Sequence, residues 1–470
     1  MAEQYQIGMV GLGVMGRNFV LNLADHGFRV VGLDKDAEKV AALRREAAGR
    51  PVLGAEGLEQ LVGALAVPRA VMLLVPAGKA VDAVIHDLLP HLAPGDLIID
   101  GGNSYYRDTD VRAKALAERG LHFLGVGISG GEHGARHGPS IMPGGSREAY
   151  ERVRPIFEAC AAHFGGEPCV TWLGPGAAGH YVKMVHNGIE YGLLQLIAES
   201  YDLMRRGLGF DDEQLHDVYD RWSRGELAGY LMEITARIFR QMDDRTGKHL
   251  IGMILDEAAQ KGTGMWASES AMDAQVPVPT IDTAVGMRGL SGDKAQREAQ
   301  SKVLLGPRPA WAGDPQRFVD QLGRALYAAW VLTYAQGLAL LAVGSRRLQY
   351  GLDLEAVARI WRGGCIIRSA LLEDIRQAYH ARPDLPNLLQ DRRLAEMVMS
   401  RQEALRAVVC AAAQQGLPAP ALMSTLAYYD SCRSAWLPAN LIQAERDYFG
   451  AHTYERVDAK GSFHTHWNED

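Results

Sequence analysis

Cysteine is scarce in this chain, which has five cysteines in 470 residues. They are Cys160, Cys169, Cys365, Cys410 and Cys432, an odd number without a CxxC pair. This spacing indicates neither a disulfide framework nor a zinc site. No metal is therefore expected, and a reducing, cytoplasmic compartment is favoured.

The chain also lacks an excess of basic residues. Its 49 Lys and Arg are outnumbered by 56 Asp and Glu, which gives a formal net charge of -7. A nucleic-acid partner would require a basic surface, so none is expected. Any phosphorylated ligand must instead be bound by a few Lys and Arg residues that converge locally.

A secretory leader and a clear membrane span are missing as well. The N-terminus leads directly into the strand-like run QIGMVGLG, so no signal peptide is expected. Residues 325–344 carry no charge over about the length of a bilayer span. Tyr327, Thr333, Tyr334 and Gln336 interrupt this stretch, which favours a buried central helix and no membrane partner.

The chain is too long for one ordinary core, and its patterning divides it into three parts. In residues 1–178, short apolar runs alternate with helical segments, which predicts an α/β Rossmann domain with a doubly wound parallel sheet. Residues 179–436 keep a helical period and predict a large all-α domain. Residues 437–470 form a C-terminal tail, in which the helical period is lost after LPANLI. The expected strands are QIGMVGL, FRVVGLD, AVMLLVP, DLIIDGG and LHFLGVGIS.

The predicted helical domain contains two long apolar stretches that look like counterparts. They cover residues 188–203 and 326–343. Their similarity suggests an internal duplication.

A glycine-rich turn, Gly11-Leu12-Gly13-Val14-Met15-Gly16, follows the first expected strand and opens a helix. The glycines permit a tight turn, a close approach of the backbone to a pyrophosphate, and helix–strand packing. The helix N-terminus attracts the phosphates. We therefore expect dinucleotide binding, the alternative being a tight turn that only packs.

The second expected strand ends at Asp34, which is followed by Lys35 and Asp36. Carboxylates at this position accept hydrogen bonds from a ribose with both hydroxyl groups and repel a 2′-phosphate. Lys35 supplies one compensating charge. NAD is therefore the expected cofactor, with NADP as the alternative.

Three further loops follow later strands, at the edge where ligands bind in open α/β sheets. Each loop alone is consistent with an ordinary turn, but three on one edge favour a binding site. The loops are Val75-Pro76-Ala77, Gly101-Gly102-Asn103 and Ser129-Gly130-Gly131.

A helix predicted over HYVKMVHNGIEYGLLQLIAES carries polar residues on one face. Lys183, Asn187, Glu190 and Tyr191 follow the i, i+4, i+7, i+8 spacing, beside apolar residues that must be buried. Burial can tune a lysine into a base and a carboxylate into an acid. Lys183 and Glu190 are therefore candidates for acid–base catalysis, the alternative being a solvated pair at the helix edge.

Seven motifs, in order along essentially the whole chain, resemble those of the decarboxylating 6-phosphogluconate dehydrogenases. They are GLGVMGRN, IDGGNS, VGISGGEHGARHGPSIMPGG, KMVHNGIEYG, ILDEAAQKGTG, WRGGCIIRS and ERDYFGAHTYE. The resemblance implies a Rossmann domain, a helical domain for substrate binding and dimerisation, and a tail that reaches into the partner of a homodimer. It also implies a place in the pentose phosphate pathway and gluconate utilisation.

The resemblance assigns roles by matching motif. Lys183 is the implied general base and Glu190 the implied general acid. Lys261 and Arg288 match ligands of the substrate phosphate. The implied substrate ligands are Asn103, Ser129, Gly130, Gly131, His186, Asn187, Tyr191, Lys261 and Arg288, with Arg446 and His452 contributed by the other subunit. The cofactor-binding residues are expected at positions 11–16, 34–36, 75–77 and 103.

Three positions depart from the family pattern. The usual Asn-Arg-Thr triplet, associated with NADP, reads Asp34-Lys35-Asp36. A lysine common after LLV is Pro76, and the lysine that often follows GTG is Met265. The first two departures agree with the electrostatic argument for NAD, whereas the third has no explanation.

The reaction implied by the resemblance oxidises and decarboxylates 6-phosphogluconate to ribulose 5-phosphate, with NAD or NADP as the oxidant. Two other hypotheses are a β-hydroxyacid dehydrogenase acting on a different acid and a non-catalytic NAD-binding regulator. The long helical domain and Arg446 argue against the first. The presence of both Lys183 and Glu190 argues against the second.

Overall fold

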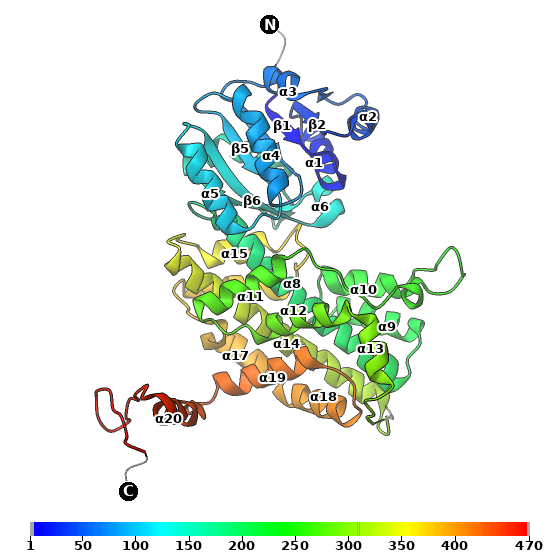
Figure 1. Ribbon diagram of the computed structural model, residues 1–470. Helices are drawn as coiled ribbons and strands as arrows, with labels where there is room; N and C mark the ends of the chain where they lie inside the picture. The colour runs from blue at the N-terminus through cyan, green and yellow to red at the C-terminus, as the bar shows by residue number, and fades with distance from the viewer. Residues whose placement is uncertain (1–3, 308, 310, 468–470) are drawn as a thin grey trace.

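The computed structural model describes residues 4–307, 309 and 311–467 of the chain. It contains two bodies, one with a β-sheet and one made of helices, and their junction lies near the start of α8 (Figure 1). The last helix, α20, projects from the side of the helical body and carries the C-terminal residues away from it.

The N-terminal body is built on a seven-stranded sheet in the order β3-β2-β1-β4-β5-β6-β7. Pairing is parallel except between β6 and β7, which are antiparallel. The doubly wound sheet is therefore confirmed, with an antiparallel edge strand that the sequence analysis did not name. The strands are β1 (Ile7–Val10), β2 (Val30–Leu33), β3 (Val52–Gly54), β4 (Ala70–Leu73), β5 (Leu97–Asp100), β6 (His122–Ser129) and β7 (Ser140–Gly145).

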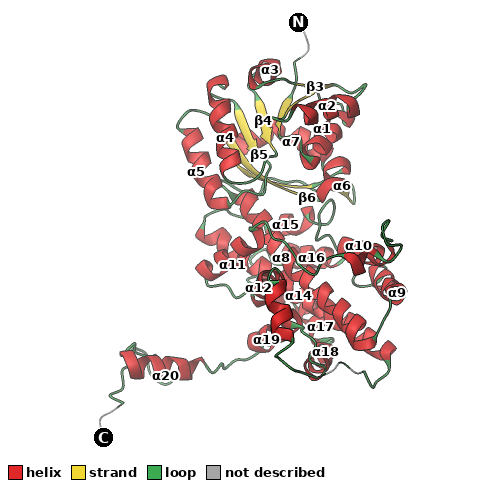
Figure 2. Ribbon diagram, turned by 45° about the vertical axis from the view of Figure 1, so that its right-hand side comes forward, coloured by secondary structure: helices red, strands yellow, loops and turns green. Residues whose placement is uncertain are grey.

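Helices cover both faces of this sheet (Figure 2). Alternate residues of β1 join different cores, because Ile7 and Met9 pack with α1 and α7 while Val10 packs with α3 and α4. Strands buried on both faces explain why the runs in this region are almost entirely apolar. The helices are α1 (Val14–Asp25), α2 (Ala37–Glu46), α3 (Leu58–Ala64), α4 (Lys79–Leu88), α5 (Tyr106–Ala117), α6 (Gly131–His137) and α7 (Arg147–Cys160). A 3-10 turn, η1 (Leu89–His91), and a hairpin of β8 (His163–Phe164) and β9 (Glu167–Pro168) complete this body.

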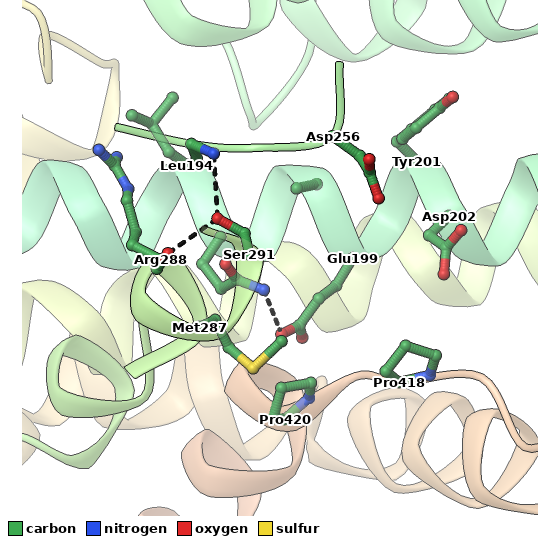
Figure 3. A pocket seen from close by; sticks show the side chains of 13 residues that line it. Leu194, Glu199, Tyr201, Asp202, Asp256, Met287, Arg288, Ser291, Pro418 and Pro420 are labelled. Atoms are coloured by element: carbon green, nitrogen blue, oxygen red, sulfur yellow. Dashed lines mark hydrogen bonds between the residues drawn. The ribbon is translucent and has the colours of Figure 1, made fainter. Parts of the chain in front are cut away.

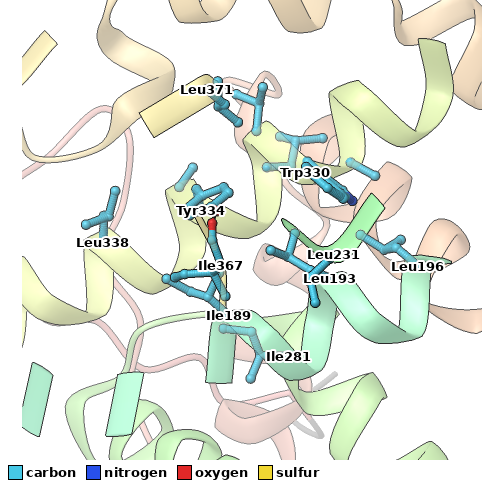
Figure 4. Close-up of a cluster of buried hydrophobic side chains, with 14 of the residues drawn as sticks. Ile189, Leu193, Leu196, Leu231, Ile281, Trp330, Tyr334, Leu338, Ile367 and Leu371 are labelled. Atoms are coloured by element: carbon cyan, nitrogen blue, oxygen red, sulfur yellow. Dashed lines mark hydrogen bonds between the residues drawn. The ribbon is translucent and has the colours of Figure 1, made fainter. Parts of the chain in front are cut away.

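The second body is helical, and its core surrounds α8 and α14. Ile189 and Leu193 of α8 lie in one apolar cluster with Trp330 and Tyr334 of α14 (Figure 4). The helices are α8 (Ala178–Asp202), α9 (Asp212–Ser223), α10 (Tyr230–Arg240), α11 (Thr263–Ala274), α12 (Pro279–Ser291), α13 (Lys294–Ser301), α14 (Pro315–Arg347), α15 (Leu354–Ile360), α16 (Leu371–Ala381), α17 (Arg392–Met399), α18 (Gln402–Gln414) and α19 (Pro420–Cys432). Shorter turns are the π-helical η2 (Leu203–Leu208) and the 3-10 helices η3 (Leu250–Met253) and η4 (Leu388–Gln390).

The long uncharged stretch belongs to α14, the only helix among the described residues that is long and apolar enough to cross a membrane. Its most apolar window is 89% buried inside the protein. The prediction of a buried central helix is therefore confirmed.

The first turns of α8 pack directly against the sheet. A Cβ atom on Gly127 of β6 would lie 2.4 Å from the Cβ of Lys183, so only glycine permits this approach. Lys183 is thereby held beside the carboxyl end of β6, where Ser129 lies. The two bodies meet at this contact, and the candidate site forms around it.

The tail differs from its prediction, because α20 (Ala439–Gly450) continues as a helix through residues where loss of the helical period was expected. The helix has no one-sided apolar stripe against its own chain: Leu441 is 61% exposed and Phe449 73%. Its end is organised by Asp447, whose buried carboxylate accepts hydrogen bonds from Thr453 N, Thr465 N and Trp467 Nε1.

Candidate active site

A cavity of about 620 Å³ opens at the carboxyl edge of the sheet. Its lining includes Met15 and all three residues of the loops 75–77 and 101–103. Ile128, next to Ser129, also lines it, and the helical body contributes Lys261 and Trp266. The structure thus brings the glycine turn, two of the predicted loops and one predicted phosphate ligand to a single cavity.

The glycine turn leaves room for a dinucleotide. Gly11 has a φ of +100°, a conformation that favours glycine, and a Cβ added at Gly13 would meet nothing within 4 Å. Gly13 is the N-cap of α1 and provides no side-chain cap, so the first N–H groups of the helix have no such partner. The residues therefore fit a pyrophosphate bound at a helix N-terminus.

The charged residues after β2 are held in fixed positions. Asp34 Oδ2 accepts a hydrogen bond from Leu12 N at 2.7 Å, which ties the acidic side chain to the glycine turn. Asp36 caps α2 by accepting from Glu38 N at 3.0 Å. Lys39, which the sequence analysis did not consider, lies 3.6 Å from Asp34 and 3.9 Å from Asp36. One lysine therefore partly offsets two carboxylates.

Lys183 and Glu190 both come from α8, and both side chains are turned toward the interior of the protein more than toward solvent. The Lys183 side chain is 6% exposed, and the Glu190 side chain is 22% exposed. Burial lowers the pKa of Lys183, although the Glu190 charge opposes this shift. Burial raises the pKa of Glu190, against the charges of Lys183 and Arg288. Both shifts favour the neutral forms, a lysine able to accept a proton and a carboxylic acid able to donate one.

His186 lies between these two residues in a fully buried hydrogen-bond network. Its Nδ1 is 3.0 Å from Asn187 Oδ1, and its Nε2 is 3.1 Å from Ser129 Oγ. Asn187 Nδ2 in turn donates to Thr263 Oγ1 at 3.1 Å. Burial and the nearby Lys183 charge hold the pKa of His186 well below its usual value, so the ring is neutral. The network links β6 to the start of α11 through α8.

The predicted phosphate ligands lie on neighbouring surfaces. Arg288 stacks over the Tyr191 ring, with its guanidinium carbon 3.7 Å from the ring centroid. It also donates to Ala259 O at 3.1 Å, on the loop that carries Lys261. Lys261 lines the cavity at the carboxyl edge of the sheet, whereas Arg288 lines a second cavity of about 570 Å³.

The second cavity opens beside α8 and α12 (Figure 3). Arg288 and Ser291 lie on one side of it and Tyr201 and Asp202 on another, while Pro418 and Pro420 lie below. Ser291 Oγ donates to Arg288 O and accepts from Ala258 N, which fixes the loop between the two cavities. This cavity was not predicted from the sequence.

Gly130 and Gly131 lie at the start of α6, directly after Ser129. In contrast, Arg446 and His452 lie on and just beyond α20, which projects from the body (Figure 1). Arg446 is exposed and contacts Gln443 at 3.0 Å within the same helix. The structure of one chain therefore does not bring these two predicted ligands to its own cavity.

Four residues of the site were not singled out from the sequence: Lys39, Thr263, Trp266 and Cys365. Trp266 packs against Tyr105 with the two rings tilted and their centroids 4.9 Å apart, and it lines the cavity at the sheet edge from the helical side. Cys365 Sγ lies 2.8 Å from His186 Nε2. Within the part of the chain that the structure describes, no three His, Cys, Asp or Glu side chains are arranged as a metal site.

A Rossmann sheet whose glycine turn shares a cavity with an adjoining helical body, beside an acid–base helix, defines an NAD(P)-dependent oxidoreductase. Two family models cover nearly the whole chain. The NAD binding domain of 6-phosphogluconate dehydrogenase matches residues 6–174, and the C-terminal domain of the same enzyme matches residues 179–467. The chain belongs to the 6-phosphogluconate dehydrogenase family.

Individual relatives agree with this assignment. The NADP(+)-dependent, decarboxylating enzyme of Bacillus subtilis is 50% identical over 467 residues, which is 99% of each chain. The decarboxylating enzyme of Escherichia coli is 48% identical over 99% of each chain. The solved structure of Plasmodium falciparum 6-phosphogluconate dehydrogenase, described in its apo form and with NADP+ and 6-phosphogluconate, has a TM-score of 0.95 and 42% identity. The structural match covers 98% of this chain and 100% of the Plasmodium chain.

Proposed function

We propose that this protein oxidises and decarboxylates 6-phosphogluconate to ribulose 5-phosphate and carbon dioxide. The observation that carries the proposal is the pair of Lys183, which is buried, and Glu190, which is partly buried, both shifted toward their neutral forms on one face of α8. Family membership supplies the substrate, which the Plasmodium structure is described as binding. In cells, this activity would serve the cytoplasmic pentose phosphate pathway and gluconate utilisation.

The first step is the oxidation of carbon 3. Neutral Lys183 accepts the proton of the C3 hydroxyl group, and a bound nicotinamide supplies the acceptor for the hydride. A protonated lysine could not perform this step, so the burial of Lys183 is essential. The result is a β-keto acid, with the newly formed ammonium of Lys183 beside the ketone oxygen.

The second step is the loss of carbon dioxide. The C3 ketone accepts the electron pair released when the bond to the carboxylate breaks, so this chain needs only a proton donor at the ketone oxygen. Lys183 can return its proton there, which gives an enediol. Glu190, kept protonated by burial, then donates a proton to carbon 2, which becomes carbon 1 of ribulose 5-phosphate, while Lys183 takes back the proton of the C3 hydroxyl group as the product ketone forms.

A substrate comparison tests the function. Purified protein should reduce NAD or NADP with 6-phosphogluconate and release one carbon dioxide per turnover. Gluconate and unphosphorylated β-hydroxy acids should be poor substrates, because Lys261 and Arg288 then lack a phosphate partner. Lys183→Met should lower kcat by at least about 100-fold while cofactor binding is retained. Equal turnover of gluconate, or a Lys183→Met kcat within about tenfold of wild type, would contradict the proposal.

We further propose that NAD is preferred over NADP. Asp34 is fixed beside the glycine turn by its bond to Leu12 N, and Asp36 adds a second negative charge. Lys35 and Lys39 bring the local charge close to balance, but carboxylate oxygens cannot donate hydrogen bonds to a 2′-phosphate. The Bacillus subtilis relative is named NADP(+)-dependent, so the proposal is that this chain departs from that relative.

The cofactor preference is tested by Asp34→Asn with Asp36→Thr. Threonine can still cap α2, and asparagine can still accept from Leu12 N, so the fold should be kept. The ratio of kcat/KM for NADP to that for NAD should rise by about tenfold or more, because two negative charges are removed and the new side chains can donate hydrogen bonds to the 2′-phosphate. Glu38→Gln removes a charge from the same helix and serves as the control. A wild-type preference for NADP of tenfold or more would show the proposal to be wrong.

We also propose that the protein is a homodimer whose tail completes the partner's site. Leu441 is 61% exposed, Ile442 59% and Phe449 73%, which is a large apolar surface for a projecting helix. Arg446 and His452 lie on this segment, outside the site of their own chain. An arginine suits a phosphate through paired hydrogen bonds, so the tail can supply charge that the partner's site requires.

Mixing two defective chains tests this exchange. Lys183→Met chains are co-refolded with Arg446→Ala chains, and heterodimers are isolated. If the tail crosses over, each heterodimer holds one wild-type site and one doubly defective site, so activity returns to about half per dimer. Arg456→Ala lies in the same tail but pairs with Asp458, and alone it should leave KM for 6-phosphogluconate unchanged. Persistently low activity in isolated heterodimers would mean that each tail serves its own chain.

A further inference from the structure

The Nε2 atom of His186 has two hydrogen-bonding neighbours where one would suffice. Ser129 Oγ lies 3.1 Å away and Cys365 Sγ 2.8 Å away. All three side chains are buried, with His186 and Cys365 fully inaccessible. Cys365 comes from the segment between α15 and α16, far from His186 in sequence, and neither the proposed mechanism nor the predicted ligand set uses it.

The proton positions follow from the partners. The neutral His186 ring carries one proton, and Asn187 Oδ1, 3.0 Å from Nδ1, can only accept. The proton therefore lies on Nδ1, and Nε2 presents one lone pair. Asn187 Nδ2 donates to Thr263 Oγ1, which agrees with this orientation of the amide.

Two donors compete for that single lone pair. The Ser129 hydroxyl accepts from Ile366 N at 3.2 Å and keeps its own proton to donate. Burial raises the pKa of the Cys365 thiol to about 12, so the thiol also keeps its proton. A thiolate here would instead pair with the Lys183 ammonium and hold that residue in its inactive, protonated form.

We propose that the Cys365 thiol is a positioning residue that holds His186 through Nε2 and so frees the Ser129 hydroxyl to donate to the substrate. In the free protein either donor satisfies His186. Once Ser129 turns toward a substrate oxygen, the thiol alone keeps the ring, and with it Asn187, in place. The substrate half of this inference rests on the proposed function, whereas the shared lone pair does not.

The free protein tests the redundancy of the two donors without any substrate. Ser129→Ala and Cys365→Ala each leave one donor on Nε2, so each should lower Tm only modestly. The double variant leaves a buried acceptor unpaired, which is costly, so its Tm should fall by clearly more than the sum of the single falls. Additive falls would overturn the inference.

The role of the thiol in the substrate complex is tested by comparing KM for 6-phosphogluconate among three substitutions of Cys365. Serine keeps a donor at position 365, whereas alanine and valine do not. Cys365→Ala and Cys365→Val should raise KM for 6-phosphogluconate about tenfold with KM for the cofactor unchanged, and Cys365→Ser should restore most of the loss. A packing role predicts the opposite order, because a serine hydroxyl fits a buried apolar position worse than valine or alanine.

Cys160→Ala is the matched control, since it removes another buried thiol, in α7, without altering the site. Its KM should stay at the wild-type value. One outcome is that the wild-type protein fails to turn over 6-phosphogluconate while the double variant loses more stability than the single variants together. In that case the proposed function is wrong, but the inference that Ser129 and Cys365 share the Nε2 lone pair is supported. A serine variant that is no better than alanine, with active wild type, would refute the role of the thiol alone.

Discussion

The desolvation of one lysine is the constraint on which this structure depends. An ammonium group removed from water is costly, and α8 removes Lys183 almost completely. The cost is reduced when the side chain loses its proton, and this is also the state that can act as a base. Three titratable groups near Lys183 are consistent with this: the ring of His186 is neutral, the Cys365 thiol keeps its proton, and Glu190 is shifted toward its acid form.

The architecture supplies that desolvation. The sheet approaches α8 at Gly127. Further along α8, Ile189 and Leu193 lie in one apolar cluster with Trp330 and Tyr334 of α14 (Figure 4). The sheet-containing body thus provides the edge that fits a dinucleotide, and the helical body buries the long helix that carries Lys183. The cavities on either side of the 258–262 loop are lined by Arg288 and Lys261, the proposed phosphate ligands, whereas Lys183 is buried.

Local patterns made much of this predictable. Strand–turn–helix spacing located the glycine turn, and helical spacing put Lys183 and Glu190 on one face of a helix, with a solvated pair at the helix edge as the alternative. The β7 edge strand was not named because SIMPGG has the glycine and proline content of a loop. The helical α20 was missed because its large apolar residues are mostly exposed, as Leu441 and Phe449 are, so it lacks the pattern of a helix with one buried face.

Contacts between distant segments could not be read from the sequence. Cys365 meets His186 although 179 positions separate them, and only the fold brings WRGGCIIRS to the end of β6. Likewise, Asp36 was expected to face the ribose, but its carboxylate also caps α2, a role that depends on where the helix begins. Motif resemblance named the expected ligands, but it did not reveal which of them share a cavity.

The most direct test is the ionisation of Lys183 itself. Trace acetylation at a series of pH values, with the peptide containing Lys183 quantified by mass spectrometry, reports the fraction of neutral amine. The account predicts a midpoint clearly below the ordinary lysine value of 10.5, because burial disfavours the ammonium. Glu190→Gln should lower it further, since the charge that opposes the shift is then removed. A midpoint at or above 10.5 in the folded protein would contradict the account.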